Sequence, residues 1–420
     1  MPTPARQLCA LLHDGHVLAD DSGRLPAFET ERRLTALVPR AAAAGDDTAV
    51  LVAPQLQVQA DPVVLLSVFA PRGERAPGRW VPPGQLAEEA AVVDALTEVD
   101  AIARGRAEAP PRRPDWFRTT WYGEVEAWVD RMLTDGRRRT GPARARKVWS
   151  MSAVVEAPCD SGPVWLKASA AHFQAEPALT RLVSELAPEH APRVIATDAD
   201  RGWLLTENIP GADEDAAPTG VGPLTARAAV AIQQRSLERR AAIDATGVPL
   251  RDLGRTAGAL DAILDDGIEL GQLTRAELAG ARAARHDAHA LLERLASLGI
   301  PDTLVHGDLH TGNVAHHDAS LVLYDWSDAC VSHPFLDAVQ LGQRLPDEER
   351  AATESAFADA WRTSYPGVDT TLALELAVRA NTLFQLVTFE QIYRAQEAAS
   401  YWEMSGVVAR WLRELPSLLT

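Results

Sequence analysis

The spacing of hydrophobic residues predicts strands in the first half of the chain. Between residues 147 and 169, apolar and polar positions alternate, β-branched residues are frequent, and a turn-forming stretch at 159–162 interrupts the alternation. This pattern predicts two or three antiparallel strands. Residues 1–110 contain short apolar runs at 49–53 and 63–70 between turn-rich segments, which predicts a small α/β domain.

Helices are predicted where apolar residues recur every three or four positions. Glu176 can begin one such helix, because Pro177 is tolerated in a first turn, and we expect this helix to run to Leu186. The proline-rich stretch 109–114 can form few regular hydrogen bonds, so we expect a domain boundary there. The other predicted elements are a helix around residues 121–132, a strand at 202–207, and mainly helical segments at 224–300 and 347–418.

The composition is that of a globular protein and argues against several classes of function. Of the 420 residues, 46% are hydrophobic and 24% are charged, which disfavours a disordered or fibrous chain. The formal net charge of −17 disfavours nucleic acid or an anionic membrane as a partner and favours a cationic small substrate.

Cys9, Cys159 and Cys330 lie too far apart in sequence to suggest a disulfide framework or a metal site. Since the sequence shows neither a secretory signal nor an apolar run near the ~20 residues of a membrane span, we expect a soluble cytoplasmic protein. Its oligomeric state stays open.

Residues 304–326 contain the most informative motif. Here the chain reads His306-Gly307-Asp308-Leu309-His310-Thr311-Gly312-Asn313 and then, after an apolar stretch, Tyr324-Asp325-Trp326. Asp308 and Asn313 keep the D-x4-N interval of a phosphotransferase loop, and Asp325 follows a predicted strand–turn–strand at the matching separation.

Each of these residue types suits transfer of a γ-phosphoryl group. The carboxylate of Asp308 can orient an attacking hydroxyl and accept its proton. Magnesium prefers hard oxygen ligands, which the amide oxygen of Asn313 and the carboxylate of Asp325 supply. Gly307 and Gly312 allow the backbone to bend tightly around the site. ATP and Mg²⁺ are therefore the expected cosubstrate and metal ion.

These motifs resemble those of the aminoglycoside phosphotransferase and choline kinase family, whose members share a protein-kinase-like fold. The resemblance covers about residues 140–420 and implies that Asp308 is the catalytic base and that Asn313 and Asp325 hold magnesium. As in the small-molecule members of the family, Trp326-Ser327 stands where protein kinases have Phe-Gly after the metal-binding aspartate.

The same resemblance implies nucleotide contacts between residues 148 and 209. Lys167, one of only two lysines in the chain, matches the strand lysine that contacts the α- and β-phosphates. Glu176 is the best match for its ion-pair partner, with Glu185 as the other choice. Ser150 and Ser152 lie where the family has a serine-containing nucleotide loop instead of G-x-G-x-x-G. The linker that grips adenine through backbone groups corresponds to Thr206, Glu207 and Asn208.

Other polar residues near the motif are expected to support it. His306 is expected to brace the loop by hydrogen bonding, and His310, inside the loop, can face phosphate or substrate. Asp337 is expected to be structural, as a helix cap or loop brace. His316 and His317 lack a third ligand at metal-site spacing, so no zinc site is expected.

Residues 78–84 weakly resemble a segment of the Nudix fold. Ala90, however, stands where the first glutamate of the Nudix catalytic helix would be. We therefore expect an accessory domain without pyrophosphohydrolase activity, which contributes to substrate choice or dimerisation.

The predicted fold class is α+β. It consists of a protein-kinase-like bilobal fold, with a small antiparallel-sheet N-lobe and a mainly helical C-lobe, preceded by a small α/β accessory domain. The expected domains are the accessory domain at residues 1–110, a linker helix and the N-lobe at 111–210, and the C-lobe with the catalytic and metal loops at 211–420.

The predicted function is ATP- and Mg²⁺-dependent phosphorylation of a hydroxyl on a small polar metabolite or antibiotic, such as an amino sugar or aminoglycoside. One alternative is a kinase that phosphorylates Ser or Thr of a short biosynthetic peptide precursor, with residues 1–110 recognising a leader segment. Another is a non-catalytic nucleotide-binding protein, which the intact set of Lys167, Asp308, Asn313 and Asp325 disfavours. The sequence alone does not identify the acceptor, because acceptor contacts in such folds follow no portable motif. The choice between ATP and GTP also stays open.

Overall fold

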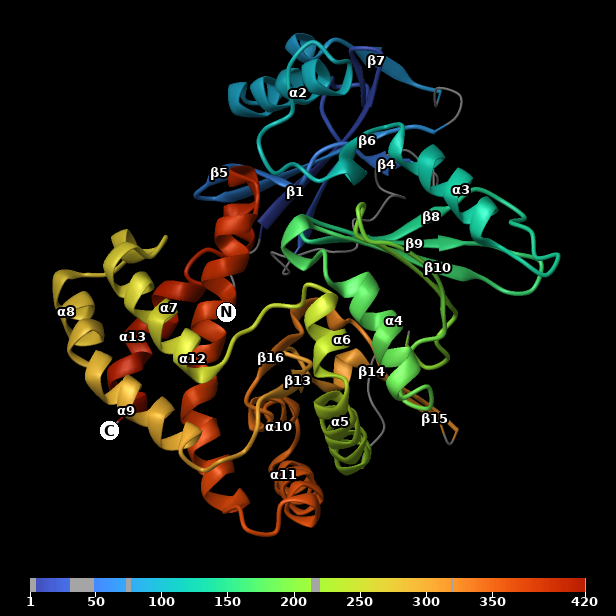
Figure 1. The fold of residues 1–420 in the computed structure, drawn as a ribbon. Coiled ribbons are helices and arrows are strands. Elements are labelled where there is room, and N and C mark those ends of the chain that lie inside the picture. Colours follow the sequence, from blue (N-terminus) through green and yellow to red (C-terminus); the bar gives the residue numbers. More distant parts are fainter. Residues whose placement is uncertain (1–4, 31–48, 73–76, 213–219, 319, 420) are drawn as a thin grey trace. The chain divides into compact units, whose positions relative to one another are not determined.

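The computed structural model describes residues 5–30, 49–72, 77–212, 220–318 and 320–419 (Figure 1). Contacts divide the chain into two units. The first unit extends to Ala170 and also includes Ala395–Met404, whereas the second consists of Ala171–Arg394 and the residues from Ser405 onward. The first unit is therefore discontinuous in sequence, and the predicted boundary at 109–114 lies inside it.

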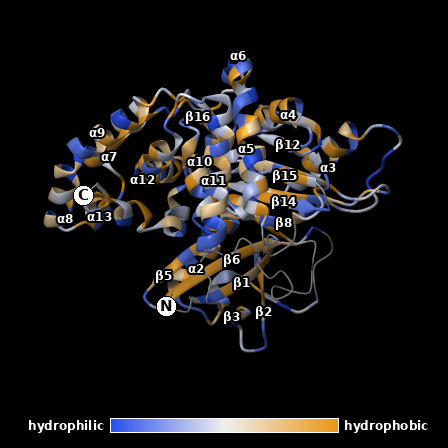
Figure 2. Ribbon diagram, turned by 90° about the horizontal axis from the view of Figure 1, so that it is seen from below, coloured by the Kyte–Doolittle hydropathy of each residue, from blue (hydrophilic) through white to orange (hydrophobic). Residues whose placement is uncertain are grey.

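The N-terminal part of the first unit contains a mixed sheet and, among its described residues, a helix that packs against this sheet. Its elements are β1 (Ala5–His13), β2 (His16–Ala19), β3 (Ala27–Thr30), β4 (Val50–Leu51), β5 (Leu56–Ala60), β6 (Val63–Ala70), β7 (Arg79–Val81), η1 (Pro83–Gln85) and α2 (Ala90–Ala103). The strand order is β4-β6-β1-β2-β7, with β3 beside β1 and β5 beside β6. β1 and β6 run parallel, and side chains at alternate positions of both strands are buried in one cluster. Val92, Leu96 and Val99 join this cluster from α2 at helical spacing. Figure 2 shows the hydrophobic character of β6 along its length.

The remainder of the first unit contains the predicted antiparallel strands. Its elements are η2 (Asp115–Phe117), α3 (Trp121–Met132), β8 (Arg144–Val148), β9 (Ser152–Ala157), β10 (Val164–Ser169) and η7 (Ala398–Met404). β9 pairs with both β8 and β10 in antiparallel register, which confirms the alternation predicted for 147–169. The indole Nε1 of Trp402 in η7 donates to the carbonyl of Gln55, 2.9 Å away, and Trp402 packs against Val63 and Leu65 of β6.

A buried ion pair fixes the segment 395–404 within the first unit. The guanidinium of Arg113 donates to both carboxylate oxygens of Glu397, at 2.9 and 2.5 Å. Both side chains are almost fully buried, with 8% and 1% of their surfaces exposed. A bidentate pair with this little exposure is geometrically specific, and removing either partner leaves an uncompensated charge.

The second unit is mainly helical. Its elements are η3 (Ala171–Phe173), α4 (Glu176–Leu186), β11 (Val194–Asp198), β12 (Trp203–Glu207), α5 (Val221–Glu238), α6 (Arg240–Ala245), α7 (Leu253–Asp266), η4 (Leu270–Gln272), α8 (Arg275–Ala283), α9 (Arg285–Ala296), β13 (Thr303–Val305), η5 (Thr311–Asn313), β14 (Val314–His317), β15 (Ser320–Leu323), η6 (Trp326–Asp328), β16 (Cys330–Ser332), α10 (Phe335–Gly342), α11 (Asp347–Ser364), α12 (Thr370–Ala395) and α13 (Val407–Leu419). The predicted helix at 176–186 and strand at 202–207 are confirmed, as are the two helical segments. The chain is therefore α+β, as predicted.

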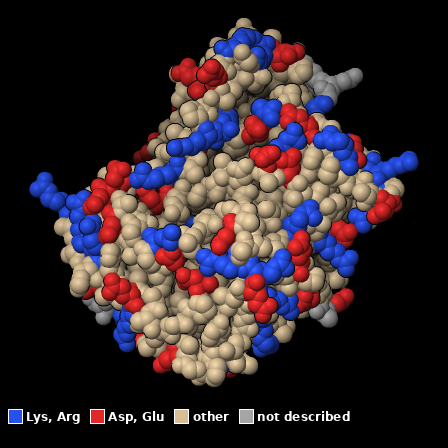
Figure 3. Space-filling model, in the orientation of Figure 1, with Lys and Arg blue, Asp and Glu red and all other residues tan. Residues whose placement is uncertain are grey.

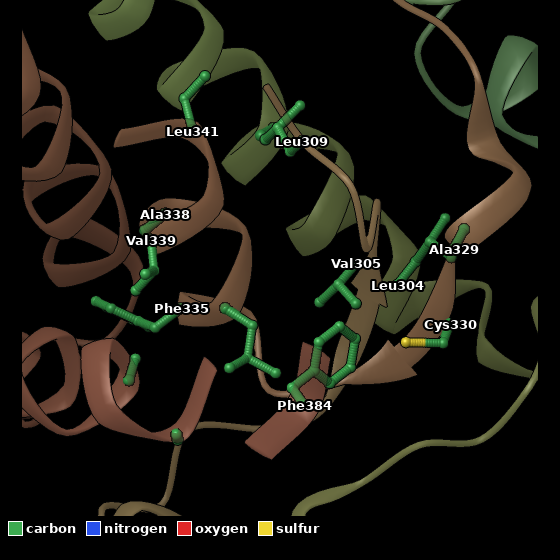
Figure 4. Packing of buried hydrophobic residues seen from close by; sticks show 14 of the residues in the cluster. Leu304, Val305, Leu309, Ala329, Cys330, Phe335, Ala338, Val339, Leu341 and Phe384 are labelled. Atoms are coloured by element: carbon green, nitrogen blue, oxygen red, sulfur yellow. The ribbon is translucent and has the colours of Figure 1, made fainter. Parts of the chain in front are cut away.

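The core of the second unit lies between its helices and the short β13–β16 pair. In Figure 4, Val305 of β13 and Cys330 of β16 point toward the ring of Phe384 from α12. All three side chains are almost completely buried. Burial raises the pKa of the Cys330 thiol to about 12, so this cysteine is an unreactive core residue. The β13–β16 pair thus anchors the chain immediately before residue 306.

α12 is the described helix that is long and apolar enough to cross a membrane by length and composition. In its most apolar window, however, 61% of the helix is buried inside the structure. Leu383, Phe384 and Leu386 belong to the core cluster of the second unit, so α12 has the character of a core helix.

Candidate active site

A loop and a hairpin in the second unit bring together Asp308, Asn313 and Asp325. The side-chain Nδ2 of Asn313 donates to the backbone carbonyl of Asp308 at 2.8 Å and lies 3.3 Å from its Oδ2. Strands β14 and β15 pair with Val314 opposite Leu323, and the N–H of Tyr324 donates to the carbonyl of Asn313 at 3.0 Å. The hairpin therefore places Asn313 directly beside the residue that precedes Asp325.

Asp325 has a left-handed backbone conformation, with φ of 65° and ψ of 61°. Aspartate tolerates this region better than most residues, but it is sparsely populated and costs free energy. The hydroxyl of Ser327 donates to Asp325 Oδ1 at 2.6 Å. A strained backbone at a carboxylate that ends a strand is typical of a functional position.

Asp337 holds the backbone at the start of the loop. Its Oδ2 accepts the N–H of His306 at 2.9 Å, and its Oδ1 accepts the N–H of Gly307 at 3.1 Å. Gln233 of α5 donates to the same carboxylate at 3.0 Å, and its own Oε1 accepts the indole N–H of Trp361 at 3.0 Å. Burial raises the pKa of Asp337, while its hydrogen bonds to the loop act in the opposite direction. The prediction of a loop brace is confirmed.

His306 ties the loop to the hairpin. Its Nε2 lies 3.0 Å from the carbonyl of Tyr324, and since a carbonyl only accepts, Nε2 carries the proton. The imidazole also packs against Trp326, with the ring centres 4.7 Å apart. The side chain is 1% exposed, so the predicted bracing role agrees with both its contacts and its burial.

Gly307 is required by the close approach of two backbone segments. Its φ is +82°, and a Cβ atom at this position would lie 2.1 Å from the carbonyl oxygen of Asp328. Any side chain would force the loop away from the η6 turn. The bend that the sequence predicted at Gly307 therefore has a definite steric cause.

The chemistry of Asn313 and Asp325 fits a hard cation. Because Nδ2 of Asn313 is engaged by Asp308, its oxygen Oδ1 is the atom left to face a ligand. Asp325 adds a carboxylate, and magnesium binds through few protein oxygens and fills its other positions with water and phosphate. Across the described ranges, no three His, Cys, Asp or Glu side chains converge as a metal site.

The predicted nucleotide residues of the second unit lie at the ends of its first elements. Glu176 is 2% exposed in the first turn of α4. Thr206, paired with Val194, is buried near the end of β12. The N–H of Glu207 donates to the carbonyl of Arg193 at 2.9 Å, and the exposed Asn208 follows directly after the strand.

The predicted nucleotide residues of the first unit lie on β9, β10 and the turn before β9. The register pairs Ser152 with Ser169 and Val154 with Lys167, so Ser152 and Lys167 lie on the same face of the two strands. The hydroxyl of Ser152 accepts the indole N–H of Trp149 at 2.8 Å. Nucleotide contacts by these residues stay predictions.

Ser150 is held by the segment that follows α12. Its hydroxyl donates to Oε2 of Glu403 at 2.5 Å and accepts from Nε2 of Gln396 at 2.9 Å. Burial raises the pKa of Glu403 to about 7 from its ordinary value of 4.5, and the nearby Glu397 carboxylate raises it further. The turn between β8 and β9 is thus joined to a group that titrates near neutral pH.

We expect Glu403 to make the stability of the protein depend on pH near neutrality. The folded state holds this proton more tightly than the unfolded chain does, so the contribution is present below pH 4.5 and is lost as pH rises to about 7. Thermal unfolding of the wild type should therefore move to lower temperature between about pH 5 and 8 more than that of Glu403→Gln, which can still accept the Ser150 hydrogen bond. Parallel pH curves for the two proteins would contradict the assignment.

Several residues that organise the site carry no motif in the sequence. Gln233 lies in an alanine-rich helical segment, and Gln340 accepts the N–H of Leu309 at 3.0 Å from α10. The hydroxyl of Tyr324 donates to the carbonyl of Gly312 at 2.8 Å. A buried glutamine inside an apolar helical stripe is the one signal that would have indicated Gln233 and Gln340.

Two solved structures illustrate the comparison with known proteins. A macrolide 2'-phosphotransferase of Brachybacterium faecium is 18% identical, and the match covers 68% of this chain and 97% of that one with a TM-score of 0.47. A choline/ethanolamine kinase family protein of Mesorhizobium loti is 14% identical, covering 70% and 99% with a TM-score of 0.41. No curated protein sequence is significantly similar to this chain.

The family comparison is the decisive one. The sequence model of the phosphotransferase enzyme family APH matches residues 160–371, which is just over half of the chain. This range contains Lys167 as well as Asp308, Asn313, Asp325 and the brace Asp337. The chain therefore belongs to the phosphotransferase enzyme family and is a phosphotransferase.

Proposed function

We propose that this phosphotransferase moves the γ-phosphoryl group of ATP to a hydroxyl group of a small polar molecule. The observation that carries the proposal is the placement of Asp308, Asn313 and Asp325 on one loop and hairpin, held by the buried Asp337. In this family, phosphoryl transfer needs one carboxylate that acts as the base, followed along the chain by two residues that supply oxygen ligands to the metal ion.

Asp308 orients the acceptor and takes up its proton. The acceptor oxygen forms a bond to the γ-phosphorus while the bond from that phosphorus to the β–γ bridging oxygen breaks, and ADP leaves. The hydroxyl proton passes to the carboxylate of Asp308, which is 48% exposed and can therefore reach a bound molecule. Magnesium, when bound, would neutralise charge on the phosphates, and Asn313 and Asp325 are the residues that would hold it.

The charge of the chain favours a cationic acceptor such as an amino sugar. The net charge of −17 attracts cations over long distances, although acidic and basic side chains are interspersed on the face in Figure 3. The attraction is a property of the whole chain, so it selects a class of acceptor and no single compound.

A phosphorylation screen tests this proposal. The wild type and Asp308→Ala are incubated with Mg²⁺ and either ATP or GTP over amino sugars, aminoglycosides, amino alcohols, nucleosides and Ser/Thr peptides. We expect phosphorylation within one small-molecule class, dependent on Asp308. Modification of the peptides alone would replace the small-molecule proposal, and no transfer together with no nucleotide binding in calorimetry would refute it.

Asp325→Asn is expected to weaken the response to magnesium. The amide lacks the negative charge that a hard divalent cation prefers, so the Mg²⁺ concentration for half-maximal activity should rise by roughly tenfold or more. The measurement is a magnesium titration at saturating nucleotide and acceptor. Asp318→Asn is the matched control, since Asp318 is 90% exposed in the turn of the same hairpin. Unchanged magnesium dependence in Asp325→Asn would exclude it as a ligand.

A further inference from the structure

The imidazole of His310 lies between Asp308 and the backbone of Gly312. Its Nδ1 accepts the N–H of Gly312 at 2.9 Å. A nitrogen that accepts a hydrogen bond from a backbone N–H carries no proton, so the proton of the neutral ring is on Nε2. Nε2 in turn lies 3.4 Å from Oδ2 of Asp308. The single ring proton therefore faces the carboxylate.

The contacts of Asp308 are confined to one of its two carboxylate oxygens. Oδ2 faces both His310 and Nδ2 of Asn313, which lies 3.3 Å away. Among the residues that the structure describes, none donates to Oδ1 of Asp308. Asp308 is 48% exposed and His310 only 15%, so the carboxylate is the more accessible of the two groups.

We propose that His310 is a positioning residue for phosphoryl transfer, a role that rests on the proposed function. The Nε2–H of His310 and the amide of Asn313 hold Oδ2, so that Oδ1 is turned toward the acceptor hydroxyl and receives its proton as the oxygen–phosphorus bond forms. The N–H of Gly312 sets the tautomer that makes this possible. The contact of 3.4 Å is longer than a typical hydrogen bond, so the proposed role requires it to shorten when the acceptor binds, as catalytic contacts commonly do.

The absence of a side chain at Gly312 independently supports this position of the His310 ring. A Cβ atom at this position would lie 2.7 Å from Cε1 and 2.9 Å from Nδ1 of His310. Only glycine therefore leaves room for the ring to approach the backbone and accept its N–H. The carbonyl of Gly312 is fixed by the hydroxyl of Tyr324 at 2.8 Å, which prevents the turn from yielding to a larger residue.

Two substitutions separate positioning of Asp308 from mere support of the loop. In His310→Gln, the amide nitrogen replaces Nε2 and can still donate to Asp308. In His310→Asn, the amide oxygen replaces Nδ1 and can still accept from Gly312, but no donor reaches Asp308. We expect kcat to fall roughly ten- to hundred-fold in His310→Asn with little change in the nucleotide KM, and His310→Gln to retain most of the activity. Rescue by Asn instead of Gln would overturn the proposal and assign the ring to loop support.

Gly312→Ala should lower kcat as much as His310→Asn does, because it displaces the ring without altering it. The double variant should be no slower than either single one, since both remove the same contact. Additive losses would show that the two residues act separately and would contradict the proposal.

A measurement without catalysis keeps this inference apart from the proposed function. Nitrogen-15 NMR of histidine-labelled protein, with the His310 signal assigned through His310→Asn, reports the tautomer directly. We expect the proton on Nε2 and a change of that signal in Asp308→Asn. A proton on Nδ1 would refute the positioning role, whereas a wild type that phosphorylates no acceptor but shows the expected tautomer would refute only the proposed function.

Discussion

Asp308→Asn is expected to slow phosphoryl transfer by orders of magnitude while leaving the fold intact. The amide cannot accept the acceptor's proton, and removing a general base typically lowers the rate by about 10²–10⁴-fold. Asn313 also directs the outcome, because its Nδ2 would attract the amide oxygen of the new side chain and turn the amide nitrogen toward the acceptor. Since the side chain of Asp308 is 48% exposed and its replacement is isosteric, the thermal unfolding temperature should change little.

The decisive comparison is between activity and nucleotide binding. Steady-state kinetics should show the loss in kcat, while calorimetry should give a nucleotide Kd close to that of the wild type. Asp318→Asn removes an exposed carboxylate from the hairpin that follows the loop and should retain full activity. An active Asp308→Asn enzyme would exclude Asp308 as the base.

Asp337→Leu is expected to cause the largest loss of stability. Leucine keeps the number of side-chain heavy atoms but is larger and cannot accept a hydrogen bond, so the N–H groups of His306 and Gly307 are left buried without an acceptor and the amide of Gln233 keeps only the carbonyl of Pro334. Each unsatisfied buried donor costs about 1–3 kcal/mol, so the free energy of unfolding should fall by about 3 kcal/mol or more. Because the two backbone groups begin the catalytic loop, activity should fall even at temperatures where the variant stays folded.

Asp347→Leu is the matched control for this prediction. Asp347 also lies in the first turn of a helix, but its side chain is 93% exposed and pairs with Arg350 at the surface. Its loss should cost about 1 kcal/mol or less in chemical denaturation. Equal destabilisation by the two substitutions would show that the brace contributes no more than a helix-end charge.

Local sequence patterns were enough to predict those strands, helices and reactive residues that are determined by residues near one another in the sequence. The helix at 176–186 followed from apolar spacing and a tolerated proline, and the hairpin before Asp325 followed from an apolar stretch broken by a turn. The D-x4-N interval indicated the catalytic loop because both of its residues lie on one short stretch of the chain. The family match, which includes that loop, bears out the class of enzyme predicted from it.

The buried support of the site could not be predicted in the same way. Gln233, Asp337 and Trp361 form one chain of hydrogen bonds although they lie on three different helices. Nothing in the spacing of one helix specifies which polar residue of another it meets, since that depends on the packing angle between them. For the same reason, the sequence did not indicate that Ala395–Met404 would join the first unit.

The position of Ala395–Met404 far along the sequence affects the order in which the parts of the first unit can fold. Glu397 follows its partner Arg113 by 284 positions, and at about 5–20 residues per second a ribosome needs roughly 15–60 s to synthesise the chain between them. During this interval Arg113, Ser150 and the β6 surface under Trp402 lack the groups that cover them. The first unit therefore cannot be completed until residues 395–404 have been synthesised, so these surfaces stay uncovered for longer than those of a domain that is contiguous in sequence.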